Sequence, residues 1–177
     1  MVIMEDRNIR PICSLFAEIL DYPKQDLLSR VEECAGLLSS VSNEAQAQLD
    51  RFRAFVEETS PGRMEEIYTS TFDLQMVCYP YAGYHLFGES YKRGIFMARL
   101  KEDYRARGFA IQGNELPDHL SVLLRFLAFL EEDELSRSLL DDCLIPVLSQ
   151  MEQVFSDNDN PYGEVIRSLS ALLRRQP

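Results

Sequence analysis

The segment Ser121 to Leu130 is the most hydrophobic part of the chain, and it constrains the fold more than any other. With Leu120 it leaves almost no polar face, and a helix that is apolar nearly all round is normally buried within a domain. About 14 residues from Pro117 onward are too few to cross a bilayer, which needs roughly 20. Because Pro117 lacks an N–H and fixes its own φ, we expect the helix to begin there. The segment 117–130 is therefore predicted to be a central core helix.

Hydrophobic residues at helical spacing predict further helices along most of the chain. The expected helical segments are 9–20, 27–38, 43–56, 61–72, 90–107, 117–130, 135–155 and 161–173. Pro146 should kink the segment 135–155 or divide it in two. The stretch 73–88 lacks this periodicity, so it is either a short helix with irregular flanks or an ordered loop. The sequence has no alternating strand pattern, which predicts an all-α, single-domain helical bundle over residues 1–177.

The composition restricts the classes of partner. The 29 acidic and 18 basic side chains give a formal charge of −11 at pH 7, which excludes nucleic acid because its phosphates would be repelled. A basic partner would be attracted, although the charge could equally serve only solubility. The segment Met1 to Arg7 reaches acidic residues before any apolar run of signal-peptide length, so we expect a cytoplasmic protein without direct membrane insertion. The four widely spaced cysteines are expected to be buried, reduced thiols.

Two carboxylates and one of the two histidines lie directly before the core helix. Glu115, Asp118 and His119 could act as an acid, a base or metal ligands, which keeps a small metal-dependent enzyme as an alternative. Equally, the two carboxylates could serve only the dipole and the free N–H groups of the helix start. The common nucleotide-binding and hydrolase motifs are absent from the sequence.

Asp73 follows the end of a predicted helix, where a negative charge is disfavoured. We expect Arg93 or Lys92 to lie near it, with direct contact between Asp73 and a ligand as the alternative. The aromatic run from Tyr79 to Phe87 is interpreted as packing or as a recognition surface, because tyrosine suits both. His85 within this run is expected to be a partly buried, hydrogen-bonded side chain.

Five short motifs, spread in order over most of the chain, carry a family resemblance. They are Leu20-Asp21-Tyr22-Pro23, Tyr68 with Thr71-Phe72-Asp73-Leu74, Gly88-Glu89-Ser90-Tyr91-Lys92-Arg93-Gly94, Glu115-Leu116-Pro117-Asp118-His119-Leu120, and Asn160-Pro161-Tyr162. Taken together, they resemble the redox-enzyme maturation chaperones of molybdenum enzymes, and within them the nitrate reductase delta-subunit (NarJ-like) branch.

The resemblance implies an all-α protein with no catalytic residues, no bound metal and no cofactor of its own. Such chaperones bind the N-terminal region of a molybdopterin oxidoreductase catalytic subunit, often a twin-arginine leader or its remnant. They hold it in the cytoplasm until the cofactor is inserted. The resemblance implies nitrate reductase or a relative as the client, and it places peptide binding at Glu115, Pro117, Asp118 and His119. Exchange of helices between protomers in the family makes a homodimer compatible with the resemblance.

Elementary energetics indicates how such a peptide would be held. Exposed ion pairs contribute only about 0 to 1 kcal/mol each. Burial of a leucine or phenylalanine contributes roughly 1.5 to 3 kcal/mol before the cost of ordering the peptide. We therefore expect an amphipathic helix in a groove. The residues expected to form it are Phe72, Tyr84 and Phe87 for apolar anchoring, and Asp73, Glu115 and Asp118 for charge selection. A structural subunit of a permanent complex is the other alternative, but it would expose a large apolar patch, and the acidic composition counts against it.

Overall fold

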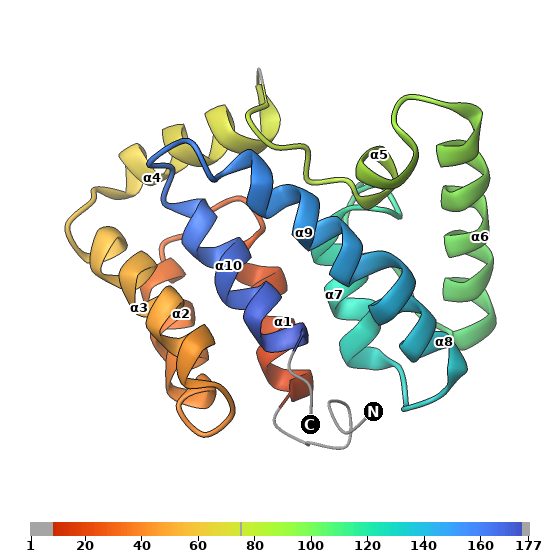
Figure 1. Cartoon of the computed structure of the whole chain (residues 1–177), viewed down its shortest axis with the longest axis horizontal. Helices are drawn as coiled ribbons and strands as arrows, with labels where there is room; N and C mark the ends of the chain where they lie inside the picture. Colours follow the sequence, from red (N-terminus) through yellow and green to blue (C-terminus); the bar gives the residue numbers. More distant parts are fainter. Residues whose placement is uncertain (1–8, 75, 175–177) are drawn as a thin grey trace.

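The computed structural model describes residues 9–74 and 76–174, and it confirms the expected all-α fold (Figure 1). Its helices in chain order are α1 (Ile9–Ile19), α2 (Leu27–Leu38), α3 (Asn43–Glu57), α4 (Pro61–Tyr68), η1 (Thr69–Asp73), α5 (Ala82–Phe87), α6 (Tyr91–Arg107), α7 (Leu120–Phe129), α8 (Glu134–Ser138), η2 (Leu139–Leu144), α9 (Ile145–Val154) and α10 (Tyr162–Leu173). Within the described ranges, the only extended pairing is an isolated antiparallel bridge between Tyr81 and His119.

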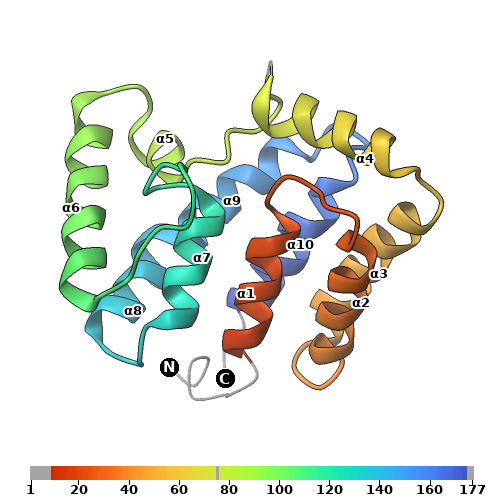
Figure 2. The same ribbon diagram turned by 180° about the vertical axis from the view of Figure 1, so that it is seen from behind.

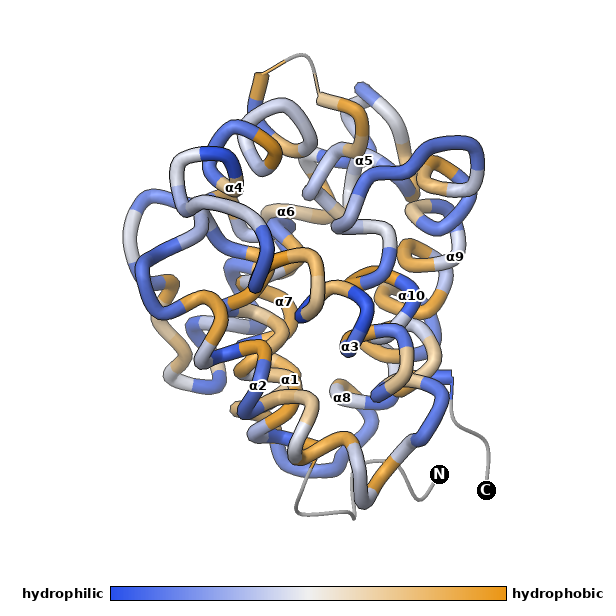
Figure 3. The backbone as a smooth tube through the Cα atoms, turned by 90° about the vertical axis from the view of Figure 1, so that its left-hand side faces the viewer, coloured by the Kyte–Doolittle hydropathy of each residue, from blue (hydrophilic) through white to orange (hydrophobic). Residues whose placement is uncertain are grey.

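The predicted core helix lies in the middle of the bundle as α7. Its residues from Leu120 to Leu124 are all buried, and α1 packs along it. On the other side α10 packs against α3 and α9, while α2 packs against α1 and α3 (Figures 1 and 2). The buried apolar side chains form one continuous cluster. Hydrophobic and hydrophilic residues alternate along most helices, as one-sided burial requires (Figure 3).

The core helix begins at Leu120, so the prediction that it starts at Pro117 is wrong. His119 is the N-cap residue, and its Nδ1 accepts a hydrogen bond from the Ser121 N–H at 3.1 Å. Pro117 lies in the preceding loop, where its carbonyl accepts from the Tyr104 hydroxyl at 2.7 Å. The Leu120 N–H donates to the carbonyl of Pro80, so the chain before it pairs with another segment and stays extended.

A wide helical turn interrupts the long segment that contains Pro146. The π-helix η2 lies between α8 and α9, and Pro146 occupies the first turn of α9. Proline cannot donate to the preceding turn, so a regular α-helix cannot run through this point. The segment is not divided in two, because α8, η2 and α9 follow one another without a break, and the kink stays a prediction. A second π-helix, η1, extends α4 and ends with the Leu74 N–H donating to the Thr69 carbonyl at 2.8 Å.

The aromatic stretch forms the short helix α5 between irregular flanks, the first of the two predicted alternatives. It leads to α6, which ends at Gly108 in the left-handed conformation with φ 71°. Only Leu100 and Tyr104 of α6 are buried, and the helix stands at one edge of the molecule (Figures 1 and 2). It is therefore the least embedded of the long helices.

The four cysteines are free and buried, as expected. Burial raises the pKa of the Cys13 thiol to about 12, so this side chain stays protonated at neutral pH. In the described part of the chain, no helix is both long and apolar enough to cross a membrane.

Candidate functional site

The loop before α7 is tied to the start of α5 by backbone hydrogen bonds. The Ala82 N–H donates to the carbonyl of Asp118 at 2.8 Å, and the Leu120 N–H donates to Pro80 at the same distance. These bonds flank the bridge between Tyr81 and His119. Two segments that lie far apart in the sequence are thus held side by side, which fixes the position of the loop that carries Glu115.

Asp118 is fully buried and anchors this junction. Its Oδ2 accepts hydrogen bonds from the Gly83 N–H at 3.1 Å and from Arg93 Nε at 3.0 Å, and its Oδ1 accepts from Arg93 Nη2 at 3.3 Å. Arg93 therefore pairs with Asp118. The sequence had predicted that Arg93 or Lys92 would lie near Asp73 instead. A buried carboxylate needs a charged, hydrogen-bonded partner, and Asp118 has the greater need because Asp73 is exposed.

Gly83 is the residue that lets Asp118 and Arg93 approach α5. A Cβ at this position would lie 2.6 Å from Asp118 Oδ2 and 2.9 Å from Arg93 Cγ. Real Cβ atoms do not approach other atoms this closely, so any larger residue would displace the ion pair. Sequence reasoning missed Gly83, although a glycine inside a helical aromatic run is a signal of close packing.

His119 is buried, and its chemistry is that of a helix cap. Its ring lies edge-on to the ring of Tyr81, with 5.5 Å between the two centroids, and its Nε2 lies 3.9 Å from Glu115 Oε2. Burial lowers the pKa of His119, with Glu115 opposing the shift. The neutral ring keeps Nδ1 as an acceptor for Ser121, so this nitrogen is occupied. His85 is half-buried and hydrogen-bonded through Nε2 to the Tyr79 carbonyl at 2.7 Å, as expected.

Three carboxylates, Glu65, Asp73 and Glu115, surround this junction, and we call them the acidic face. Glu115 accepts a hydrogen bond from the Tyr81 hydroxyl at 3.4 Å. Burial raises the pKa of Tyr81, and Glu115, Asp118 and Asp73 raise it further. The pKa of Tyr22 is raised by desolvation and then by Glu65 and Asp73. Asp73 acts on both tyrosines, so its charge lies between that of Glu65, which acts on Tyr22, and that of Glu115, which acts on Tyr81.

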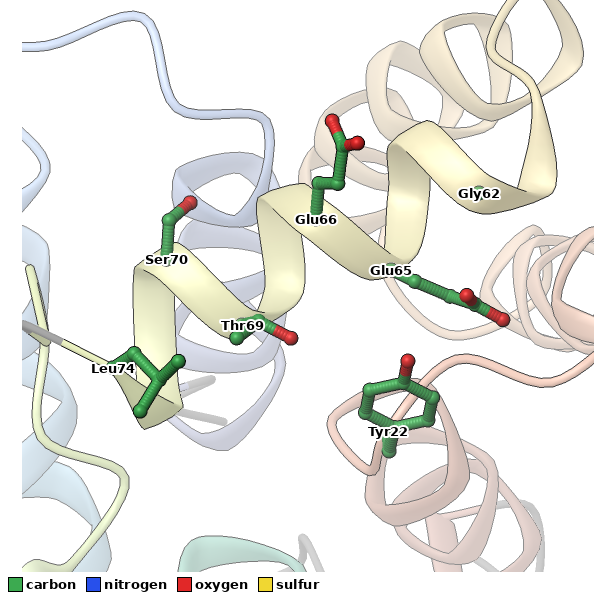
Figure 4. Close-up of a pocket in the computed structure, with 7 residues that line it drawn as sticks. All are labelled: Tyr22, Gly62, Glu65, Glu66, Thr69, Ser70 and Leu74. Atoms are coloured by element: carbon green, nitrogen blue, oxygen red, sulfur yellow. The ribbon is translucent and has the colours of Figure 1, made fainter.

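A groove of about 880 Å³ runs beside the acidic face, between the helix α4 with η1 and the loop after α1. We call it the α4 groove (Figure 4). Its lining residues are Tyr22, Gly62, Glu65, Glu66, Thr69, Ser70 and Leu74. Glu65 and Thr69 point toward Tyr22 across it. Leu74 is 66% exposed and Tyr22 is 50% exposed, so the groove offers apolar surface directly to solvent.

The structure separates the predicted apolar anchors. Phe72 is only 4% exposed, with its ring centroid 5.2 Å from Tyr68 and 5.1 Å from Tyr162, so it supports η1 from beneath. Tyr84 stacks on Tyr79, with 3.7 Å between centroids. Phe87 packs on α6 and lines a separate hollow of about 300 Å³.

The remaining predicted residues lie together. Glu115, Pro117, Asp118 and His119 occupy one loop, and Asp73 is close enough to affect the same tyrosine as Glu115. Sequence reasoning missed the groove residues Tyr22, Glu65 and Leu74. Tyr22 precedes Pro23 and Leu74 follows a helix end, but neither position alone signals a groove, because it forms between segments far apart in the chain.

The arrangement of helices is that of a redox enzyme maturation protein. A crystal structure assigned to such a protein from Archaeoglobus fulgidus superposes with a TM-score of 0.67 at 23% identity, covering 94% of each chain. This likeness shows a shared fold. A family model described as "Nitrate reductase delta subunit" matches residues 38–167. The chain therefore belongs to the nitrate reductase delta subunit family, which confirms the resemblance seen in its motifs.

Two of the similar proteins are named as assembly chaperones. The Bacillus subtilis (strain 168) protein assigned as the nitrate reductase molybdenum cofactor assembly chaperone NarJ is 30% identical over 156 residues, covering 88% of this chain and 84% of the relative. The Escherichia coli (strain K12) chaperone NarJ is 24% identical, covering 84% of this chain and 64% of the relative. The nitrate reductase-like protein NarX of Mycobacterium tuberculosis is 30% identical, but the match spans 22% of its length. These relatives confirm the expectation that the chain is not an enzyme.

Proposed function

We propose that this chaperone assembles a molybdenum-containing nitrate reductase, or a closely related molybdoenzyme, by holding the N-terminal region of its catalytic subunit. It does so in the cytoplasm, before the cofactor is inserted. The names of its relatives support the client class. One observation supports the location of the site: the open, partly apolar α4 groove lies directly beside the acidic face. Both surfaces are already exposed before any client binds.

The two surfaces suit a basic, amphipathic segment. Apolar side chains of the client would lie against Tyr22 and Leu74, which are already exposed and lose water on binding. Basic side chains of the client would face Glu65, Asp73 and Glu115. The apolar contacts supply most of the affinity, because exposed ion pairs contribute about 0 to 1 kcal/mol each. The charges mainly select the partner and accelerate encounter.

The loop from Glu115 to His119 contributes in two different ways. Glu115 and Leu116 are exposed and contact the client, while Asp118 and His119 are buried and act by positioning. Pro117 keeps Leu116 out of a helical turn, since the residue before a proline avoids the helical region. The pairing with residues 80–82 holds Asp118 and His119 outside α7. Tyr84 and Phe87 lie on α5 and are reached only by a client segment that continues past the acidic face.

The metal-dependent enzyme is not supported as an alternative. His119 uses Nδ1 to cap α7, and Asp118 is saturated by Arg93 and Gly83. Neither side chain can turn toward a metal ion without breaking the junction that holds the loop. The chaperone function therefore explains why these residue types stand together without invoking chemistry.

A peptide titration tests the proposed site. A synthetic peptide with the N-terminal sequence of the candidate catalytic subunit is titrated by calorimetry into the wild-type protein and into Glu65→Gln with Glu115→Gln. We expect the double variant to bind up to about tenfold more weakly, with a shallower dependence on salt, because two exposed ion pairs are lost. Glu32→Gln with Asp157→Asn is the matched control, since it removes two exposed carboxylates elsewhere. Equal loss in both double variants, or no binding to the wild type, would contradict the proposal.

A further inference from the structure

The helix α6 is strongly basic in an acidic protein. Of the 18 basic residues in the chain, six lie on α6. They are Lys92, Arg93, Arg99, Lys101, Arg105 and Arg107. The net charge of the whole chain is −11, so α6 presents a local charge opposite to that of the rest of the molecule. A surface of this kind attracts acidic partners.

Most of these basic side chains form no ion pair with the described part of the chain. Arg93 pairs with Asp118, and Arg107 pairs with Asp133 at 2.6 Å. The other four side chains are exposed, and they form no ion pair with the described residues. Two ion pairs thus fasten α6 to the body near its ends, while its outward charges remain available.

The outward side of α6 also exposes apolar surface. Tyr91 is 76% exposed and Ile95 is 61% exposed. Residues four apart lie on the same face of a helix, so the two side chains form one short apolar stripe. Lys92 and Arg99 lie beside it on the exposed side. We call this combination the α6 outer face.

The α4 groove is complementary to the α6 outer face in both respects. It offers the apolar side chains of Tyr22 and Leu74, it is lined by the carboxylate of Glu65, and Asp73 lies close enough to act on Tyr22. The groove and α6 stand at opposite sides of the molecule in both ribbon views (Figures 1 and 2). A helix tied to the body by Arg93 and Arg107 cannot reach across to its own groove, so the complementary partner is another copy of the chain.

We propose that the α6 outer face of one copy docks into the α4 groove of a second copy. Tyr91 and Ile95 would lie against Tyr22 and Leu74, with Lys92 facing Glu65. The interface is head-to-tail, because it joins two different surfaces, and it does not close on itself between two copies. A part of this proposal rests on the proposed function: the docked helix occupies the client site, so client peptide and self-association compete.

Analytical ultracentrifugation of the protein at low salt, over a wide range of concentrations, measures its self-association and tests this proposal. The α6 variant is Lys92→Gln with Ile95→Ser, and the groove variant is Glu65→Lys with Asp73→Lys. The wild type should associate with rising concentration, and each variant alone should associate at least about tenfold more weakly, because a buried aliphatic anchor or a charge match is lost. Both variants change side chains that are exposed or at the groove, and circular dichroism checks that they fold.

Mixing the two variants is the decisive step. The α6 variant keeps an intact groove and the groove variant keeps an intact α6, so the mixture should form a one-to-one complex that grows no further. An interface between two like faces, α6 to α6 or groove to groove, cannot produce this result. Leu74→Ser serves as a second groove variant, since it changes one exposed side chain. A wild type that stays monomeric, variants that associate like the wild type, or a mixture that stays monomeric would each overturn the proposal.

The client peptide separates this proposal from the proposed function. The α6 variant should bind the peptide as tightly as the wild type, and the peptide should dissociate wild-type assemblies. Peptide binding by a wild type that never associates would overturn self-docking and leave the proposed function intact. Association and complementation by mixing, without any peptide binding, would leave self-docking intact and overturn the proposed function.

Discussion

The carboxylate of Asp118 and the guanidinium of Arg93 join the loop before α7 to α6 through two hydrogen bonds of 3.0 and 3.3 Å. Asp118 is fully buried, and the Arg93 side chain is 21% exposed. The pair lies where three segments meet, because Gly83 at the start of α5 donates to the same carboxylate. It therefore sets the position of the loop that carries Glu115.

Breaking this pair should destabilise the protein strongly. We expect Asp118→Asn to lower the free energy of unfolding by about 3 kcal/mol, because Arg93 loses its partner in a largely buried place. Urea denaturation measures the change. Glu66→Gln is the control, since its ion pair with Arg63 is exposed and its loss should cost under about 1 kcal/mol. A double-mutant cycle with Arg93→Gln should show coupling between the two positions, and additive effects would contradict the structural role.

Two glycines should respond to alanine in opposite directions. Gly83→Ala places a Cβ against Asp118 and Arg93 and should cost about 1 to 3 kcal/mol of stability. Gly36→Ala, within α2, meets no atom within 4 Å and should stabilise the protein by up to about 1 kcal/mol. Thermal and urea unfolding of both variants test the pair. Equal effects of the two substitutions would show that α5 does not pack against the ion pair as described.

Acidification should destabilise the protein partly through His119. Burial lowers the pKa of this ring below its usual value of 6.5, so the unfolded chain binds the proton more readily than the folded one. The contribution of the neutral His119 ring to the free energy of unfolding is therefore fully present above pH 6.5, and it is lost as the pH falls through the folded-state pKa. His119→Asn keeps a good cap residue without a titrating group, so its stability should fall less steeply below that pH. Urea denaturation at a series of pH values measures this. The same fall in the free energy of unfolding with pH in both proteins would contradict the prediction.

Phe72 and Leu74 should separate stability from client binding. Phe72→Ala empties part of the aromatic cluster around Tyr162 and should cost about 3 to 5 kcal/mol of stability. Leu74→Ser changes a mostly exposed side chain, so stability should hardly change while client peptide binds about tenfold more weakly. Val154→Ser, at another exposed apolar residue, is the control for both readouts. Normal peptide affinity in Leu74→Ser would remove the α4 groove from the site.

Helical periodicity predicted most of the fold, because an amphipathic helix records its buried face locally. The start of α4 illustrates this: Ser60 accepts from the Arg63 N–H at 3.3 Å with Pro61 in the first turn, as that dipeptide indicates. The start of α7 was misplaced by three residues for a non-local reason. Residues 118–120 pair with 80–82, and this pairing outweighs the preference of Pro117 for a first helical turn.

The candidate site was only partly predictable. The loop from Glu115 to His119 stands out by composition and family motif, but its division into exposed Glu115 and buried Asp118 depends on which segment packs over it. The partner of Arg93 could not be found from spacing, because Asp73 and Asp118 both lie many residues away from it in the chain. Phe72 and Leu74 lie two residues apart yet face opposite environments, because side chains two residues apart do not share a helix face and Leu74 is the extended residue that ends η1.

The most direct measurement of the central claim is affinity capture of the tagged full-length protein from the cytoplasm of cells grown without oxygen. We expect one large molybdopterin oxidoreductase subunit to be retained and to be released by a peptide of its own N-terminus. The Leu74→Ser protein should retain less of it than the Val154→Ser control. Retention that the peptide does not reverse, or equal retention by the two variants, would contradict client binding in the α4 groove.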